Sequence, residues 1–113
     1  MRCERLDVWK RSCRLSVEVY KNFTESKDFG FKDQITRSSL SIPGNLAEGL
    51  EKESDREKVR YIEIARGSSA ELITQIYIGV EVGYIEKVIG MRWTRELKEL
   101  SKMLSGLKKN YVK

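Results

Sequence analysis

Five positively charged side chains near the C-terminal end of the sequence are spaced so that they share one face of a helix. They are Arg95, Lys98, Lys102, Lys109 and Lys113. Such a strip can neutralise the phosphates of a nucleic acid without reading its sequence, because the contacts are made to the backbone. The alternative is an ordinary solvated face, stabilised by pairs such as Arg95 with Glu99.

The charge excess of the chain lies in the same segment. The 113 residues include 22 Lys and Arg and 17 Asp and Glu, which gives a net charge of +5. Residues 91–113 hold seven of these cations and two of the carboxylates, so the remaining 90 residues are neutral overall. The sequence therefore places its basic character in one C-terminal element.

Side chains suited to catalysis or metal binding are scarce. Histidine is absent, which removes the commonest general base and metal ligand. Cys3 and Cys13 do not suggest a disulfide framework, and Cys13 is expected to pack as a small apolar side chain. Glu71 has no evident base, nucleophile or metal cluster to work with. We expect a protein that is not an enzyme and that holds no cofactor or metal.

The elements that position these residues are predicted to be four helices, because apolar residues recur at spacings of three and four almost everywhere. The first two run from about residue 6 to 23 and from about 31 to 50. The third begins at Ser54, which forms a capping box with Glu57, and the fourth runs from about 89 to 111. No strand pattern is evident, so the predicted fold is all-α, an antiparallel up-down four-helix bundle forming one domain over residues 1–113.

The sequence shows no sign of a membrane span or of export. It has no run of about 18 apolar residues, and its charged N-terminus lacks the apolar core of a signal peptide. A cytoplasmic location away from membranes is expected.

Two helices have more apolar faces than one core requires. The first helix is expected to bury a stripe consisting of Leu6, Trp9, Cys13, Val17 and Tyr20. Its second apolar set is Val8, Leu15 and Val19, and the third helix has Ile64, Ile78 and Val82 outside its main stripe. Surplus apolar faces at helical spacing predict a subunit interface, although scattered exposed apolar residues are also normal.

Glu71 lies among the surplus apolar residues of the third helix. A carboxylate in a desolvated contact needs a cation, and the candidates are Arg37 and Arg66. We therefore place Arg37 and Glu71 in the predicted interface.

The stretch SLSIPGNLAEG puts Pro43, Gly44 and Gly49 inside the second predicted helix. Proline there removes a hydrogen bond and favours a kink. The small residues would let the third helix, with its ARGSSA segment, approach closely. This interpretation competes with a ligand-binding loop, but no phosphate-binding glycine motif is present.

Three segments carry a family resemblance: LDVWKRSCRLSVEVY, FGFKDQITRSSLSIPGNLAEG and IEIARGSSAELITQIYIGVEVGYIE. They resemble the signatures of the four-helix-bundle family encoded in intervening sequences of bacterial 23S rRNA genes. That family includes proteins similar to the accessory variability determinants of diversity-generating retroelements. The resemblance covers roughly residues 6–86.

The resemblance implies a basic, non-enzymatic protomer that assembles into a homopentameric ring with a central channel. It also implies binding to nucleic acid, RNA or RNA paired with DNA, together with a reverse transcriptase. The alternative function is a protein-binding scaffold with no nucleic-acid role, whose basic face docks an acidic partner.

Overall fold

The computed structural model describes residues 1–112 and consists of four helices. They are α1 (Asp7–Asn22), α2 (Phe29–Leu50), α3 (Asp55–Glu81) and α4 (Lys87–Lys108). No strand occurs within the described residues, so the all-α, four-helix prediction is confirmed. Within the same range, no helix combines the length and hydropathy needed to cross a bilayer.

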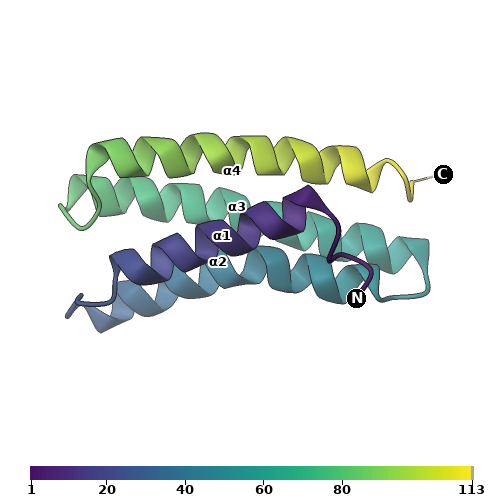
Figure 1. Ribbon diagram of the computed structural model, residues 1–113, viewed down its shortest axis with the longest axis horizontal. Coiled ribbons are helices and arrows are strands. Elements are labelled where there is room, and N and C mark those ends of the chain that lie inside the picture. Colours follow the sequence, from purple (N-terminus) through teal and green to yellow (C-terminus); the bar gives the residue numbers. More distant parts are fainter. Residues whose placement is uncertain (113) are drawn as a thin grey trace.

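The helices lie alongside one another in a bundle that measures 45 × 22 × 20 Å (Figure 1). Each helix packs against two neighbours, in the cyclic order α1, α2, α3, α4. The pairing of α2 with α3 is the most extensive and that of α1 with α4 the least. The bundle therefore has an α1–α4 side and, opposite to it, an α2–α3 side.

Local sequence explains where the helices begin and end. The side chain of Ser54 accepts a hydrogen bond from the backbone N–H of Glu57 at 3.2 Å, as the predicted cap requires. Asp28 caps α2 in the same way through the N–H of Phe31. Gly83 follows α3 with a φ of 87°, a left-handed conformation that glycine adopts without strain.

The core along α3 and α4 consists of apolar residues at the helical spacings of three and four noted in the sequence, with Leu72, Ile76, Trp93, Leu97 and Leu100 all buried. The α1 face was predicted wrongly. Its buried residues are Val8, Ser12, Leu15, Ser16 and Val19, whereas Val17 and Tyr20 are 51% and 44% exposed.

Val8, Leu15 and Val19 are therefore core residues of the protomer, and their assignment to a subunit interface is wrong. The prediction failed because the inner face of α1 also contains two buried serines, Ser12 and Ser16. Ser12 donates to the carbonyl of Trp9, and Ser16 forms a hydrogen bond with Ser39 of α2 at 2.9 Å. A hydroxyl that is hydrogen-bonded is tolerated inside a core. A prediction based only on apolar residues, however, treats serine positions as exposed. A charge at Leu15 would therefore disturb folding rather than assembly.

Pro43 is buried within α2, as the sequence predicted. The small residues around it bring α2 and α3 together. The hydroxyls of Ser41 and Ser68 bond to each other, and a Cβ added at Gly49 would lie only 2.3 Å from the Cβ of Tyr61. The expected close contact between the two helices is therefore confirmed.

The two cysteines are both free thiols. Cys3 is fully buried. Cys13, which we expected to pack as a small apolar side chain, is only partly buried.

Candidate nucleic-acid interface

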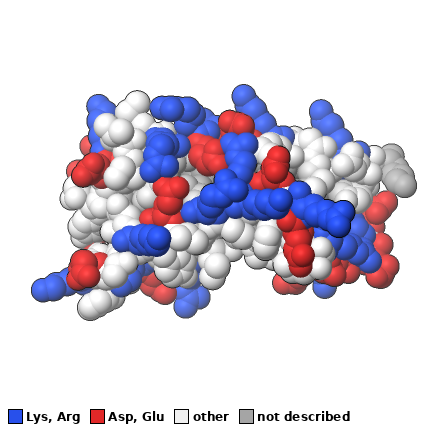
Figure 2. All heavy atoms as spheres, viewed as in Figure 1, with Lys and Arg blue, Asp and Glu red and all other residues white. Residues whose placement is uncertain are grey.

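The four helices divide the charge of the chain unequally between the two sides. α1 has four Lys and Arg against two Asp and Glu, and α4 has six against two, so this pair carries a net +6. α2 has two against two and α3 has four against five, so the opposite pair carries a net −1. Figure 2 shows Lys and Arg gathered over α1 and α4, with carboxylates between them.

Four of the five strip residues predicted from sequence are exposed as expected. Arg95, Lys98 and Lys102 lie on the outer face of α4, and Lys109 follows the last residue of that helix. None of these four side chains forms an ion pair or hydrogen bond within residues 1–112, since the ion pairs of α4 involve other residues. The alternative pair of Arg95 with Glu99 is not formed, because Glu99 bonds to Arg11. Lys113 lies outside the described residues.

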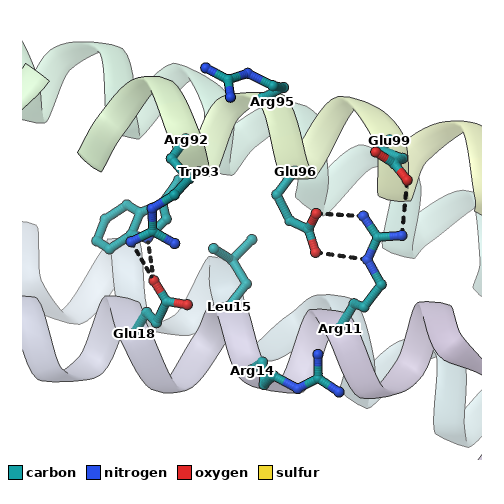
Figure 3. A pocket seen from close by; sticks show the side chains of 9 residues that line it. All are labelled: Arg11, Arg14, Leu15, Glu18, Arg92, Trp93, Arg95, Glu96 and Glu99. Atoms are coloured by element: carbon teal, nitrogen blue, oxygen red, sulfur yellow. Dashed lines mark hydrogen bonds and ion pairs between the residues drawn. The ribbon is translucent and has the colours of Figure 1, made fainter. Parts of the chain in front are cut away.

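Two polar clusters tie α1 to α4 (Figure 3). In the first, Arg11 donates hydrogen bonds to both carboxylate oxygens of Glu96 and a third to Glu99 at 2.9 Å. The hydrogen bond from Arg11 holds the pKa of Glu99 below its usual value. The contact with Arg11 therefore favours the ionised form of Glu99.

The second cluster is centred on Glu18, which accepts from Arg92 at 2.9 Å and from the indole N–H of Trp93 at 3.0 Å. The bond from Arg92 is the main reason why the pKa of Glu18 lies below its usual value. This contact also gives the buried indole of Trp93 its hydrogen-bond partner.

A cavity of about 340 Å³ lies between these clusters, and two unpaired guanidinium groups border it. Arg14 of α1 and Arg95 of α4 both line the cavity, and neither makes an ion pair or hydrogen bond in the part of the chain that the structure describes. Figure 3 shows Arg95 on the outer side of α4 and Arg14 without a partner. The sequence prediction missed Arg14, because the face of α1 that points outward was misassigned.

The remaining apolar residues of the predicted interface are Ile64 and Ile78 on the outer face of α3 and Val82, which follows α3. Ile64, Ile78 and Val82 are all exposed, so this part of the pattern is indeed left uncovered by the protomer. Whether a second subunit covers them stays a prediction. The predicted cations for Glu71 are wrong, since Glu71 instead accepts a hydrogen bond from Ser38 at 2.8 Å.

Each of the two candidate cations is held by a carboxylate on its own helix. Arg37 bonds to Asp33 and Arg66 bonds to Glu63, at separations of four and three residues. Such neighbours on one helix are reached more easily than a side chain on another helix. Among residues 1–112, no cluster of three or more Cys, Asp or Glu side chains is arranged to hold a metal ion.

Comparison with known proteins identifies the family. The model of a family described as 23S rRNA-intervening sequence protein matches residues 4–106. A crystal structure of a protein with unknown function from the S23 ribosomal protein family of Bacteroides thetaiotaomicron VPI-5482 is similar in shape. Its TM-score is 0.83 at 24% identity, over 90% of this chain and 98% of that one, a likeness that shows the fold alone. No functionally curated protein matches the chain. Because the family model spans most of its length, the chain belongs to the 23S rRNA-intervening sequence protein family.

Proposed function

We propose that this chain is a non-enzymatic accessory protein that binds nucleic acid, RNA or an RNA–DNA duplex, through its α1–α4 side. The observation that carries the proposal is the set of exposed, unpaired cations on that side, which comprises Arg14, Arg95, Lys98, Lys102 and Lys109. The family description, which refers to 23S rRNA, supports RNA as the first ligand to test.

The geometry favours contacts to phosphate over contacts to bases. From Arg95 to Lys109 the strip spans about 20 Å along the helix axis. Its members are long, flexible cations on a convex helix face, which suit a phosphate backbone. They are hydrogen-bond donors without acceptors, so they discriminate little between base edges. Glu96 and Glu99 repel phosphate at the seam, so the strand is expected to follow the outer face of α4.

We further propose that antiparallel, up-down protomers assemble through the α2–α3 side, into the homopentamer that the resemblance implies. Exposed Ile64 and Ile78 support this side as the contact. So do Gly44 and Gly67, because a Cβ at either would meet no atom of the protomer within 4 Å. The basic side would then point away from the contact, and its repetition around the oligomer would strengthen weak nucleic-acid binding.

A reverse transcriptase is the protein partner that the family resemblance implies, and it is part of this proposal.

A salt titration tests the nucleic-acid proposal. Arg95, Lys98, Lys102 and Lys109 are all replaced by glutamine, and filter binding to a structured RNA is measured across salt concentrations. We expect weaker binding and a shallower salt dependence, by roughly one unit of slope for each phosphate that the variant no longer neutralises.

The matched control replaces four cations that belong neither to the strip nor to the predicted interface, Lys27, Lys32, Lys52 and Arg56, by glutamine. It should leave the slope as in the unchanged protein. If the α4 variant keeps the original slope, the α1–α4 side is not the interface. If that variant instead loses only a protein partner, the alternative scaffold function is correct.

Sedimentation tests the assembly proposal. The unchanged protein should sediment as an oligomer at micromolar concentration, and the variant Ile64→Glu with Ile78→Glu should sediment as a folded monomer, because each substitution places a charge in a desolvated contact. Val88→Glu on α4 serves as a control for adding charge at an exposed apolar position. A monomeric unchanged protein would exclude the α2–α3 contact.

A further inference from the structure

A groove of about 780 Å³ runs between α3 and α4, beside the basic strip. Its floor is apolar and includes Ile73, Ile76 and Val80. A Cβ at Gly90 would lie 2.5 Å from Cγ2 of Val80, so the two helices approach closely there. α4 contributes no side chain to the floor at that point, which leaves the groove open along the helix axes.

The walls of the groove carry apolar side chains that the protomer does not cover. Tyr77 of α3 is 67% exposed and Met91 of α4 is 54% exposed. Neither makes a side-chain hydrogen bond or a ring contact within the described residues. Apolar walls that flank an apolar floor favour an apolar ligand surface.

The rim of the groove is basic on one side. Lys87, Arg95 and Lys98 border it from α4, whereas Glu81 is the carboxylate that borders it from α3. None of the three cations is engaged in an ion pair by the described part of the chain. Lys87 and Lys98 are 11 positions apart, or about 16 Å along the helix axis, which corresponds to about three turns of a helix laid alongside.

We propose that this groove docks an acidic amphipathic helix of a partner protein. An apolar stripe at spacings of three and four residues would enter between Tyr77 and Met91, as in other helix-in-groove contacts. Asp and Glu beside that stripe would pair with Lys87, Arg95 and Lys98. Charge complementarity therefore defines the partner, and the site shares Arg95 and Lys98 with the proposed phosphate contacts.

The composition of the groove favours a helix over a single-stranded nucleic acid. Stacked bases need a series of aromatic platforms, and Tyr77 is the single aromatic residue that lines this groove. The aliphatic floor instead matches leucine-like side chains. Because Arg95 and Lys98 belong to both surfaces, the docked helix and a nucleic acid should compete.

The experiment uses a displayed library of 18-residue peptides. Leucines are fixed at four positions of one helical face, and the flanking positions vary among Glu, Gln and Lys. The library is selected against the full chain, and enriched peptides are titrated by fluorescence anisotropy. We expect enriched peptides to carry mostly Glu beside the leucines.

Two matched double variants locate the binding. Tyr77→Ser with Met91→Ser, which keeps the charge, should weaken the enriched peptides at least tenfold and leave the salt slope for structured RNA unchanged. Val17→Ser with Leu40→Ser alters two similarly exposed apolar residues in a separate groove between α1 and α2. This variant should change neither the peptide affinity nor the salt slope for RNA. The RNA readout keeps this test separate from that of the proposed function.

Several outcomes would overturn the proposal. They are the absence of any enriched peptide, enrichment of neutral or basic flanks, and equal affinity for the Tyr77→Ser, Met91→Ser variant. A tenfold loss of oligothymidylate binding in that variant would assign the groove to single-stranded nucleic acid. A change in its sedimentation would assign the groove to a second copy of the chain.

Discussion

The α2–α3 side and the α1–α4 side join their helices by opposite means. Between α2 and α3, short side chains meet directly, as in the pair of Ser41 with Ser68 and the contact of Gly49 with Tyr61. Between α1 and α4, long side chains reach across the seam, as in the pair of Arg11 with Glu96. Side-chain length thus separates a closely packed side from a polar, bridged one.

This difference also determines what each side leaves for partners. On the α2–α3 side, hydroxyls are satisfied inside the helix pair, so the outer face is left with isoleucines and glycines. On the α1–α4 side, carboxylates bind some cations and leave others, including Arg14 and Arg95, unpaired. Surplus charge at one side and surplus apolar surface at the other suit different classes of partner.

The same substitution at two glycines should give the largest contrast between the sides. Gly49→Ala introduces a Cβ against the Cβ of Tyr61, and such overpacking costs about 1–3 kcal/mol. Gly106→Ala meets no atom within 4 Å, so the better helix propensity of alanine should stabilise it by about 1 kcal/mol or less. Urea unfolding of both variants measures the contrast, and a stabilising Gly49→Ala would show that α2 and α3 are not closely packed.

Two exposed glycines sharpen the comparison further. Within the protomer, Gly44→Ala and Gly67→Ala should each stabilise the helix by about 1 kcal/mol or less, as at Gly106. If a second subunit packs against the α2–α3 side, both substitutions should weaken assembly while Gly106→Ala does not. Sedimentation at several concentrations separates the two effects. If all three variants form the same oligomer at the same concentrations, Gly44 and Gly67 do not lie in the subunit contact.

The smallest expected effect is acid sensitivity of the α1–α4 side. The pKa of Glu18 is lowered in the folded state from a reference value of 4.5, mainly by Arg92. Its contribution to stability is therefore complete above about pH 4.5 and is lost as the pH falls through the lower, folded-state pKa. Unfolding followed between pH 7 and 3 should show a smaller acid-dependent loss in Glu18→Gln than in the unchanged protein. An identical loss in both would show that this ion pair does not contribute.

The sequence predicted the parts of the molecule that depend on local patterns. The apolar residues at spacings of three and four in the fourth predicted helix correctly placed Arg95, Lys98 and Lys102 on its exposed face, and the capping residue Ser54 marked the start of α3. The orientation of α1 failed because its inner face includes buried serines. The groove between α3 and α4 was not predicted, because it depends on which helices become neighbours and on how closely Gly90 lets them approach.

The weak pairing of α1 with α4 has a consequence for how the chain folds. Helices that follow each other in sequence make the extensive contacts, so the contact order is low and most of the bundle should form rapidly. The seam that joins the first and last helices closes the longest loop for the least packing. We therefore expect the amides of α1 to exchange hydrogen through local opening before those of α2 and α3. A nucleic acid that contacts both Arg14 and Arg95 would bind only the closed seam, and would slow that exchange in proportion to its occupancy.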